Sequence, residues 1–289
     1  MLNIAAYLFP SSVEEALEML AAHSGNARLI AGGTDLVLQS QRGQCPAAVF
    51  VDITRIPGLD KIEERDGYIF IGANVTHAAV AKSPLIRQRA NVLAEACGMV
   101  GGPQIRNVGT LVGNVVNALP AADGAIALTA LDAEAEIADE MGRRWAPVIE
   151  LYEDVGICRV NPCAQMVTAL RFHPLERGMN GAYQRLSQRR ALCLPMLAVA
   201  TVVDIEEGRF RQARIAIGPV APRPLRPAEA EAALDGVPVN AENIAHAARL
   251  AAKASHPRDS LLRGSAEYRT AMVEVLVRRA LSKAAGLEV

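Results

Sequence analysis

The sequence predicts an α+β protein that folds as two domains. Its 289 residues exceed what one compact core usually holds. The last third of the chain runs from strand patterns into helix patterns, an order typical of the α+β class. The pattern changes near Gly181, after a region that mixes short helices and strands, and we place the domain boundary there.

The first predicted elements lie upstream of residue 55. A Ser-x-x-Glu capping box, Ser12 to Glu15, precedes a helix at 13–22 whose apolar residues fall on one face. Apolar runs bounded by glycine and polar residues then predict a strand, a short helix and a buried strand, at 27–32, 36–41 and 47–54.

A second subdomain is predicted from Leu59 onward. Two alternating runs flank Asp66 and Gly67, which is a strong hairpin signal. Helical spacing follows at 77–86 and 91–101. The stretch 103–124 is rich in glycine, asparagine and proline, so it predicts an ordered loop. Alternating acids predict a strand over ALTALDAEAEIAD, 127–139, and a turn at Gly142 is predicted to reverse the chain after it.

The C-terminal region begins with sheet. A basic segment after Gly181 leads into the apolar run LAVATVVDI, and an alternating strand follows Glu207 and Gly208. Three helical patterns then close the chain, at 228–234, 241–253 and 266–285.

Composition excludes several classes of protein. Thirty basic residues nearly cancel 31 acidic ones, so the net charge of −1 gives no bias toward nucleic acid or an anionic membrane. No apolar run approaches the roughly 20 residues of a membrane span. The N-terminal segment lacks the features of a secretory leader, so a cytoplasmic location is expected.

The five cysteines form no CxxC pair, which favours reduced thiols. Cys158 and Cys163 could contribute to a metal or cluster site only if two more ligands converged on them. The alternative is that both are ordinary thiols.

Two glycine-containing stretches are the candidate binding loops. They are AGGTDLV, 31–37, and GTLVGNVVNALPAAD, 109–123. Glycine lets backbone amides approach and hold a pyrophosphate without basic side chains. Residues 32–35 would offer amides and the Thr34 hydroxyl, and Thr110, Gly113 and Asn114 could offer the same from the second loop. Together they predict one ligand whose diphosphate is held from both sides.

Each loop also has a simpler interpretation. Gly32 and Gly33 could form a tight turn, and residues 108–123 could be a plain loop. Neither loop is a Rossmann fingerprint or a P-loop, since GxGxxG after a strand and GxxxxGK[ST] are both absent.

These stretches carry a family resemblance. ARLIAGGTDLV and PQIRNVGTLVGNVVNALPAAD, in this order and separation, resemble the two FAD-binding motifs of the flavoprotein (medium) subunit of the molybdenum hydroxylases. That family includes carbon monoxide dehydrogenase, xanthine dehydrogenase, nicotinate dehydrogenase and 4-hydroxybenzoyl-CoA reductase. DITRIPGLDKIEE, IGANVTHAAVA and GAYQRLSQRRAL resemble further family segments, so the resemblance covers nearly the whole chain.

The resemblance implies a fold and a domain division. Residues 1–175 would form an FAD-binding domain of the vanillyl-alcohol-oxidase-like (PCMH) type, with subdomains at about 1–57 and 58–175. Residues 178–289 would form the small α+β C-terminal domain, an antiparallel sheet with helices.

The resemblance also implies positions for the cofactor-binding residues. Residues 31–36 (Ala31, Gly32, Gly33, Thr34, Asp35 and Leu36) would cradle the pyrophosphate, with Thr110, Gly113 and Asn114 on its other side. Asp123 would lie near the ribityl or flavin portion. Met166 and Val167 would pack beside the cofactor, and Arg185 would approach the isoalloxazine.

Three positions depart from the family pattern. Val112 stands where a second glycine is usual, Cys193 where an aspartate is common, and Gln165 where a glutamate is usual. We assign no chemistry to any of them.

Other side chains leave two interpretations open. His77 could relay protons, or cap and pack at a helix start. Tyr183 could shield a flavin edge or be an ordinary buried strand residue. The run Arg185, Arg189 and Arg190 could be a solvated face or could stabilise a negatively charged reduced cofactor.

The implied function is electron transfer. No GxSxG, HExxH or His/Cys metal cluster occurs, so we expect no catalytic side chain and assign the chemistry to the FAD. By the resemblance, electrons would come from [2Fe-2S] clusters on a small partner subunit and pass to NAD, a quinone or another acceptor. The molybdenum cofactor would lie on a large partner subunit, and the complex would be a dimer of heterotrimers.

Two other classes of protein remain possible from the sequence. One is a stand-alone flavin reductase similar to UDP-N-acetylenolpyruvylglucosamine reductase, which would oxidise NADPH alone. The other is an assembly subunit without flavin, which would be colourless.

Overall fold

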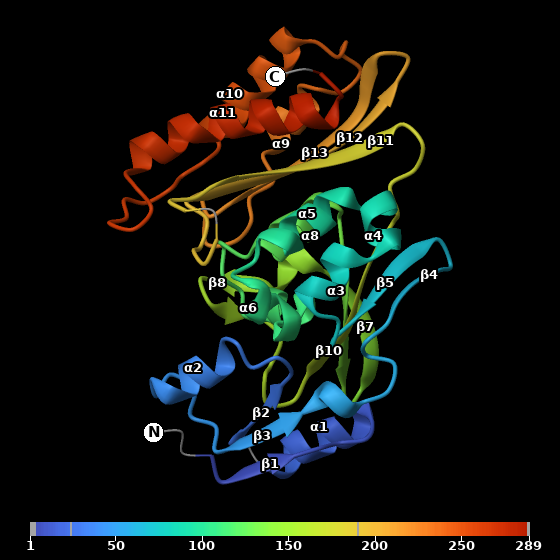
Figure 1. The fold of residues 1–289 in the computed structure, drawn as a ribbon, viewed down its shortest axis with the longest axis vertical. Coiled ribbons are helices and arrows are strands. Elements are labelled where there is room, and N and C mark those ends of the chain that lie inside the picture. Colours follow the sequence, from blue (N-terminus) through green and yellow to red (C-terminus); the bar gives the residue numbers. More distant parts are fainter. Residues whose placement is uncertain (1–3, 24, 190, 288–289) are drawn as a thin grey trace.

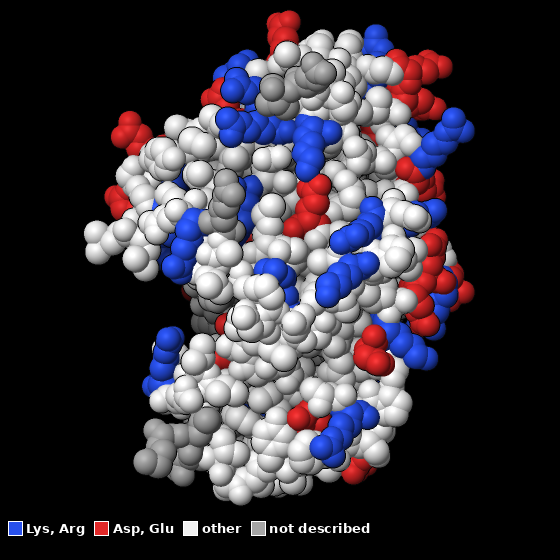
Figure 2. Space-filling model, in the orientation of Figure 1, with Lys and Arg blue, Asp and Glu red and all other residues white. Residues whose placement is uncertain are grey.

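The structure, a computed structural model, describes residues 4–23, 25–189 and 191–287. It confirms the α+β class: the three larger of its four sheets are stacked along the long axis of the molecule, with helices between and outside them (Figure 1). Among the described residues, no helix is long and apolar enough to span a membrane. Basic and acidic side chains are interspersed on the face that Figure 2 shows, in keeping with the near-zero net charge.

The N-terminal subdomain is a three-stranded parallel sheet in the order β1-β3-β2. Its strands are β1 (Ala6–Leu8), β2 (Ala27–Ile30) and β3 (Val49–Asp52), and its helices are α1 (Val13–Ala22) and α2 (Leu36–Gln41). The Ser12 hydroxyl caps α1 by accepting the Glu15 amide at 3.1 Å. The Glu15 carboxylate returns to the Ser11 amide rather than to that of Ser12. The predicted helix start is therefore correct, although the Glu15 carboxylate bonds to the amide of Ser11, one residue before the cap residue Ser12.

The central part of the chain forms a five-stranded antiparallel sheet in the order β4-β5-β10-β6-β7. Its strands are β4 (Ile62–Arg65), β5 (Tyr68–Gly72), β6 (Glu134–Asp139), β7 (Gly142–Pro147) and β10 (Met166–Phe172). The hairpin at Asp66 and Gly67 forms as predicted, and both residues have positive φ. The remaining short elements are the strand pair β8 (Tyr152–Asp154) and β9 (Ile157–Cys158) and the 3-10 turns η1 (Ile53–Arg55), after β3, and η2 (Val148–Leu151), after β7.

Short helices pack beside this sheet, and here two sequence predictions are wrong. The stretch 103–124 is largely helical rather than a loop. The strand predicted at 127–139 is helical in its first four residues. The helices are α3 (His77–Lys82), α4 (Pro84–Arg89), α5 (Asn91–Met99), α6 (Pro103–Val108), α7 (Leu111–Val116) and α8 (Asp123–Ala130).

The C-terminal region has its own core. Strands β11 (Met179–Leu186), β12 (Leu197–Glu206) and β13 (Arg209–Gly218) form an antiparallel sheet. Helices α9 (Ala228–Ala232), α10 (Ala241–Lys253) and α11 (Ala266–Ala284) follow it. Helices α10 and α11 cover one face of the sheet, and α5 and α8 of the preceding region pack on the other face (Figure 1).

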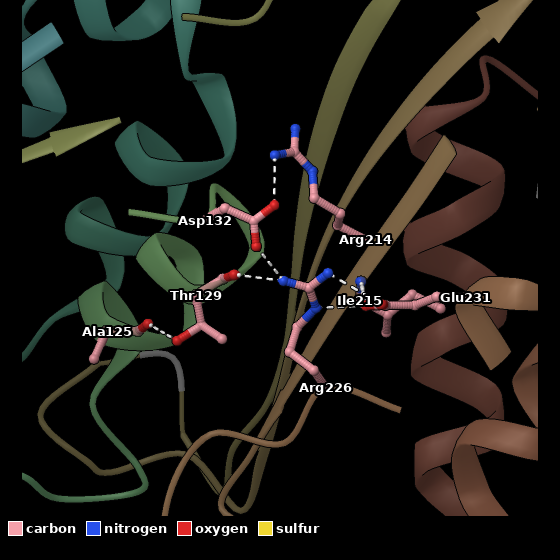
Figure 3. Close-up of polar contacts among 7 residues, drawn as sticks. All are labelled: Ala125, Thr129, Asp132, Arg214, Ile215, Arg226 and Glu231. Atoms are coloured by element: carbon pink, nitrogen blue, oxygen red, sulfur yellow. Dashed lines mark hydrogen bonds and ion pairs between the residues drawn. The ribbon is translucent and has the colours of Figure 1, made fainter. Parts of the chain in front are cut away.

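An ion network joins the turn after α8 to the C-terminal sheet (Figure 3). Arg226 pairs with Asp132 and with Glu231 of α9, and it donates to the Thr129 carbonyl at 3.1 Å. Arg214 of β13 lies 2.9 Å from the other oxygen of Asp132. One carboxylate therefore receives two guanidinium groups across the contact between α8 and β13.

We expect Arg226→Ala to lower the free energy of unfolding by about 2 kcal/mol, because it leaves the half-buried Glu231 without its guanidinium partner. Urea unfolding followed by circular dichroism measures the change. Arg249→Ala, an exposed position on α10, is the control and should change stability by less than about 0.5 kcal/mol. Equal losses in the two variants would contradict a role for this network.

Candidate functional site

A cavity of about 550 Å³ lies where the two glycine loops meet. This volume is within the range of small-molecule and cofactor sites. Residues from both loops and from the central sheet line it. Those singled out from the sequence are Ala31, Gly32, Gly33, Thr34, Asp35, Leu36, Thr110, Gly113, Asn114, Met166 and Val167.

The two loops touch through their backbones at Gly32. A Cβ added to Gly32 would lie 1.9 Å from the Val108 carbonyl oxygen and 3.0 Å from the Gly109 Cα. A Cβ added to Gly109 would lie 3.4 Å from the Thr34 hydroxyl oxygen. Gly33 has a φ of +66°, which a residue with a side chain rarely adopts. The sequence AGGT is therefore what allows the first loop to lie against the second.

The first loop presents unused backbone donors. Within the described chain, no acceptor receives the amide N–H of any of residues 32–35. Successive N–H groups of this kind in a turn are typical of anion-binding concavities. Burial raises the pKa of the neighbouring Asp35 carboxyl, although contacts with Asn117 and Thr34 oppose the shift.

The second loop differs from expectation at Gly113. The Thr110 hydroxyl caps α7 and accepts the Gly113 amide at 3.0 Å, so this N–H is not available to a ligand. The amides of Thr110 and Val112 have no acceptor among the described residues, and both residues line the cavity. Val112, which departs from the family pattern, is buried in the main hydrophobic core.

The Asn114 side chain bonds to a neighbouring helix of the same chain, so its Oδ1 is already used. Its Oδ1 accepts the Ala125 amide at the start of α8, at 3.3 Å. A Cβ added to Gly124 would lie 2.9 Å from the same oxygen. The second loop and α8 therefore fit together as one unit behind the cavity.

Met166 and Val167 begin β10 and line the cavity from the central sheet. Gln165, the residue before them, also lines it. Its amide nitrogen donates to Asp139 at 3.0 Å, and its Oε1 accepts the Asn161 amide at 2.9 Å. Gln165 thus holds the turn that leads into β10.

Asp123 and Arg185 are not on the cavity wall. Arg185 Nε lies 2.9 Å from Asp123 Oδ1, and the Tyr183 hydroxyl donates to the same oxygen at 2.7 Å. The Asp123 and Arg185 side chains are 5% and 3% exposed, so this is a buried ion pair between α8 and β11. Burial raises the pKa of the Asp123 carboxyl, and Arg185 and Tyr183 oppose that shift. A contact of Asp123 or Arg185 with a flavin stays a prediction.

The other basic and cysteine positions singled out from the sequence lie at several places in the structure. Arg189 is exposed and donates to the Leu192 carbonyl, whereas Arg190 is outside the described residues. The Cys193 carbonyl accepts a hydrogen bond from Arg185. Cys158 lines the cavity and Cys163 contacts Arg28 at 3.1 Å. The described residues contain no group of three His, Cys, Asp or Glu side chains that could hold a metal ion.

Several cavity residues were not singled out from the sequence. Asn117 accepts a hydrogen bond from Gln39 at 3.0 Å, and this pair ties α7 to α2 beside the loops. The contact of Val108 and Gly109 with Gly32 was also not predicted. Gly109 lies between Val108 and the cap residue Thr110, and a glycine permits a close backbone approach at this point.

His77 joins the wall from α3. Its side chain is 3% exposed and lines the cavity, while Thr76 caps the helix and the His77 amide donates to the Gly109 carbonyl at 3.0 Å. Burial and the nearby Arg106 lower the pKa of His77 to about 4, so the ring is neutral at pH 7. His77 therefore begins the helix without capping it.

Comparisons with known proteins agree with this geometry. Residues 2–172 match the FAD binding domain in molybdopterin dehydrogenase, and residues 182–284 match the CO dehydrogenase flavoprotein C-terminal domain. The alpha subunit of the 6-hydroxypseudooxynicotine dehydrogenase complex from Paenarthrobacter nicotinovorans is 33% identical, over 96% of this chain and 93% of that protein. The carbon monoxide dehydrogenase medium chain of Hydrogenophaga pseudoflava is 30% identical, over 96% of each chain.

A solved structure extends the likeness to the whole fold. Carbon monoxide dehydrogenase from Hydrogenophaga pseudoflava, in a form that lacks the Mo-pyranopterin moiety, matches with a TM-score of 0.93 and 30% identity over 98% of both chains. The family model covers more than half of the chain, and the relatives cover nearly all of it. The chain therefore belongs to the family of FAD-binding medium subunits of the molybdenum hydroxylases, which are oxidoreductases.

Proposed function

We propose that this chain holds FAD in the cavity between the two glycine loops and passes electrons from iron-sulfur clusters of a partner subunit to an external acceptor such as NAD or a quinone. The observation that carries the proposal is the set of amides at residues 32–35 without an acceptor among the described residues, in a loop that lines the cavity and is in backbone contact with the second loop. Such amides suit a diphosphate, which FAD contains. When bound, the flavin supplies the ability to accept and release electrons.

Each wall of the cavity has its own part in holding the cofactor. Residues 31–36 contact the diphosphate through their backbone amides. Thr110 contacts it from the other side, through its amide and its hydroxyl hydrogen. Gly113 and Asn114 shape the second loop. Met166 and Val167 pack beside the cofactor with apolar contact, which excludes water from it.

Two partner subunits complete the proposed complex. A small iron-sulfur subunit would deliver the electrons, and a large subunit with the molybdenum cofactor would bind and convert the organic substrate. We expect a dimer of heterotrimers in the cytoplasm. The similar proteins are named as subunits or medium chains, and this chain matches nearly their full length.

The acceptor can be identified by reoxidation. The FAD-loaded chain is reduced anaerobically with dithionite, then mixed with NAD⁺ or with a soluble quinone, and the return of the flavin absorption is followed. We expect one acceptor to restore it at least about tenfold faster than the other, since an acceptor site discriminates by transition-state binding. Purification with the two partner subunits is the second readout. A chain that is recovered alone and turns over an organic substrate with NADPH would contradict the proposal and favour a stand-alone reductase.

A further inference from the structure

Arg28 is the one lysine or arginine among the described residues that line the cavity. It lies on β2, at the edge of the N-terminal sheet. The residue is half-buried, so part of its surface stays open to a ligand. Within the described chain, a ligand bound in the cavity would therefore meet a basic side chain at this position alone.

Hydrogen bonds hold the guanidinium group of Arg28 at the N-terminal end of β2. Its Nη1 donates to the Gly25 carbonyl at 2.8 Å and to the Ala27 carbonyl at 2.7 Å, and it lies 3.1 Å from the Cys163 sulfur. Cys163 is on the turn before β10, and Gln165 of the same turn lines the cavity. Neither Nε nor Nη2 has an acceptor among the described residues. The group is thus fixed through one nitrogen, and the other two remain for a ligand.

This anchor directs the side chain away from the loop that is proposed to hold the diphosphate. Arg28 precedes Gly32 by four residues, and an extended chain advances about 3.3 Å per residue, so their backbones lie up to about 13 Å apart. The two carbonyls that hold Nη1 belong to Gly25 and Ala27, which are further still from the loop along the chain. Arg28 would therefore meet the part of a dinucleotide that extends beyond the diphosphate.

The two ends of the cavity differ in character. Val108 touches Gly32, and the helix that it ends, α6, carries Ile105 on the cavity wall, together with the neighbouring Val100. Along the long axis of the molecule, α6 lies between β2 and the C-terminal region (Figure 1). This apolar end lies away from Arg28 and suits the broad isoalloxazine ring. The adenosine half of FAD is left for the end with the guanidinium group.

We propose that Arg28 binds the adenosine half of the cofactor and so makes the site selective for FAD over FMN. A guanidinium plane stacks on aromatic rings, and its free N–H groups donate to the ring nitrogens of adenine or to ribose hydroxyls. The inference rests on the proposed function, because it requires FAD in this cavity.

The test measures three ligands with the full, flavin-free chain. FAD and FMN are titrated by flavin fluorescence, and ADP is titrated in competition with FAD. We expect the wild-type chain to bind FAD at least about tenfold more tightly than FMN. Arg28→Met keeps an unbranched side chain without the guanidinium, and we expect it to weaken FAD and ADP about tenfold each and FMN less than about twofold. Arg42→Met, at an exposed position that ends α2, is the matched control and should change none of the three affinities.

Arg28→Lys separates ligand binding from a purely structural role. Lysine can still donate to the carbonyls of Gly25 and Ala27, but it lacks the planar group that stacks and donates from several nitrogens. We expect the flavin-free lysine variant to unfold at the wild-type temperature and yet to bind ADP at least about fivefold more weakly than wild type.

Four results would overturn the inference. They are wild-type affinity for FAD and ADP in Arg28→Met, full recovery of ADP binding in Arg28→Lys, a weakening of FMN as large as that of ADP, and a wild-type chain in which ADP does not compete with FAD. Each of them leaves FAD binding by the wild-type chain, and hence the proposed function, intact. A wild-type chain that binds no FAD would overturn both together, so the two failures are distinguishable.

Discussion

Gly32→Ala is expected to lower FAD affinity by about 100-fold or more. The new Cβ would lie 1.9 Å from the Val108 carbonyl oxygen and 2.5 Å from its carbon. Both are backbone atoms, so relief requires the two loops to move apart, which costs about 3 kcal/mol or more. Separation of the loops also breaks the convergence of amides that would hold the diphosphate. FAD titration of the flavin-free chain measures the loss.

Gly98→Ala is the matched control for this substitution. Gly98 lies in α5, and its added Cβ would be 4.0 Å from the Ala81 Cβ, an ordinary contact. An alanine in a helix is favoured over glycine by about 0.5 to 1 kcal/mol, so this variant should bind FAD normally and unfold at a slightly higher temperature. If Gly32→Ala binds FAD as well as Gly98→Ala does, the contact between the loops is not needed for the site.

Asp123→Ala is expected to lower the free energy of unfolding by about 3 to 5 kcal/mol. It leaves the Arg185 guanidinium buried without its carboxylate and removes the acceptor of the Tyr183 hydroxyl. Since Asp123 begins α8 and Arg185 lies on β11, the contact between the cavity region and the C-terminal sheet should loosen first. Urea unfolding of the flavin-free chain measures the loss.

A double-mutant cycle shows whether the pair acts as a unit. Arg185→Met alone should also be strongly destabilising, because the Asp123 carboxyl then stays buried without its cation. The double variant Asp123→Ala, Arg185→Met should cost less than the sum of the two single variants. Additive losses would show that the two side chains contribute independently.

The sequence predicted the elements that carry local signals. Helices α1, α10 and α11 begin at the polar caps Ser12, Asn240 and Ser265, and their sequence patterns locate them. The hairpin at Asp66 and Gly67 formed for the same reason, since only a few residue pairs suit that turn.

The two wrong predictions have a physical explanation. Helices α6 and α7 have six residues each, too few for a helical period to be recognised, and their glycine, proline and asparagine content resembles that of loops. Helix α8 is buried on every side, so it has no polar face. A short apolar run of this kind cannot be told from a buried strand by its pattern alone.

The candidate site was predictable in part. Glycine content and order singled out both loops, which line one cavity. The backbone contact of Gly32 with Val108 depends on packing between segments more than 70 residues apart, and no local pattern encodes it. The capture of the Gly113 amide by Thr110 is also a consequence of three-dimensional packing.

Whether this chain holds FAD is measured by the visible absorption spectrum of the purified chain, combined with the mass of any released cofactor. In the proposed complex the amides of residues 32–35, which have no acceptor among the described residues, hold the diphosphate of FAD. We predict a flavin spectrum, release of FAD in a ratio of about one per chain, and loss of both in Gly32→Ala. A colourless wild-type chain that takes up no FAD when it is supplied would contradict the account.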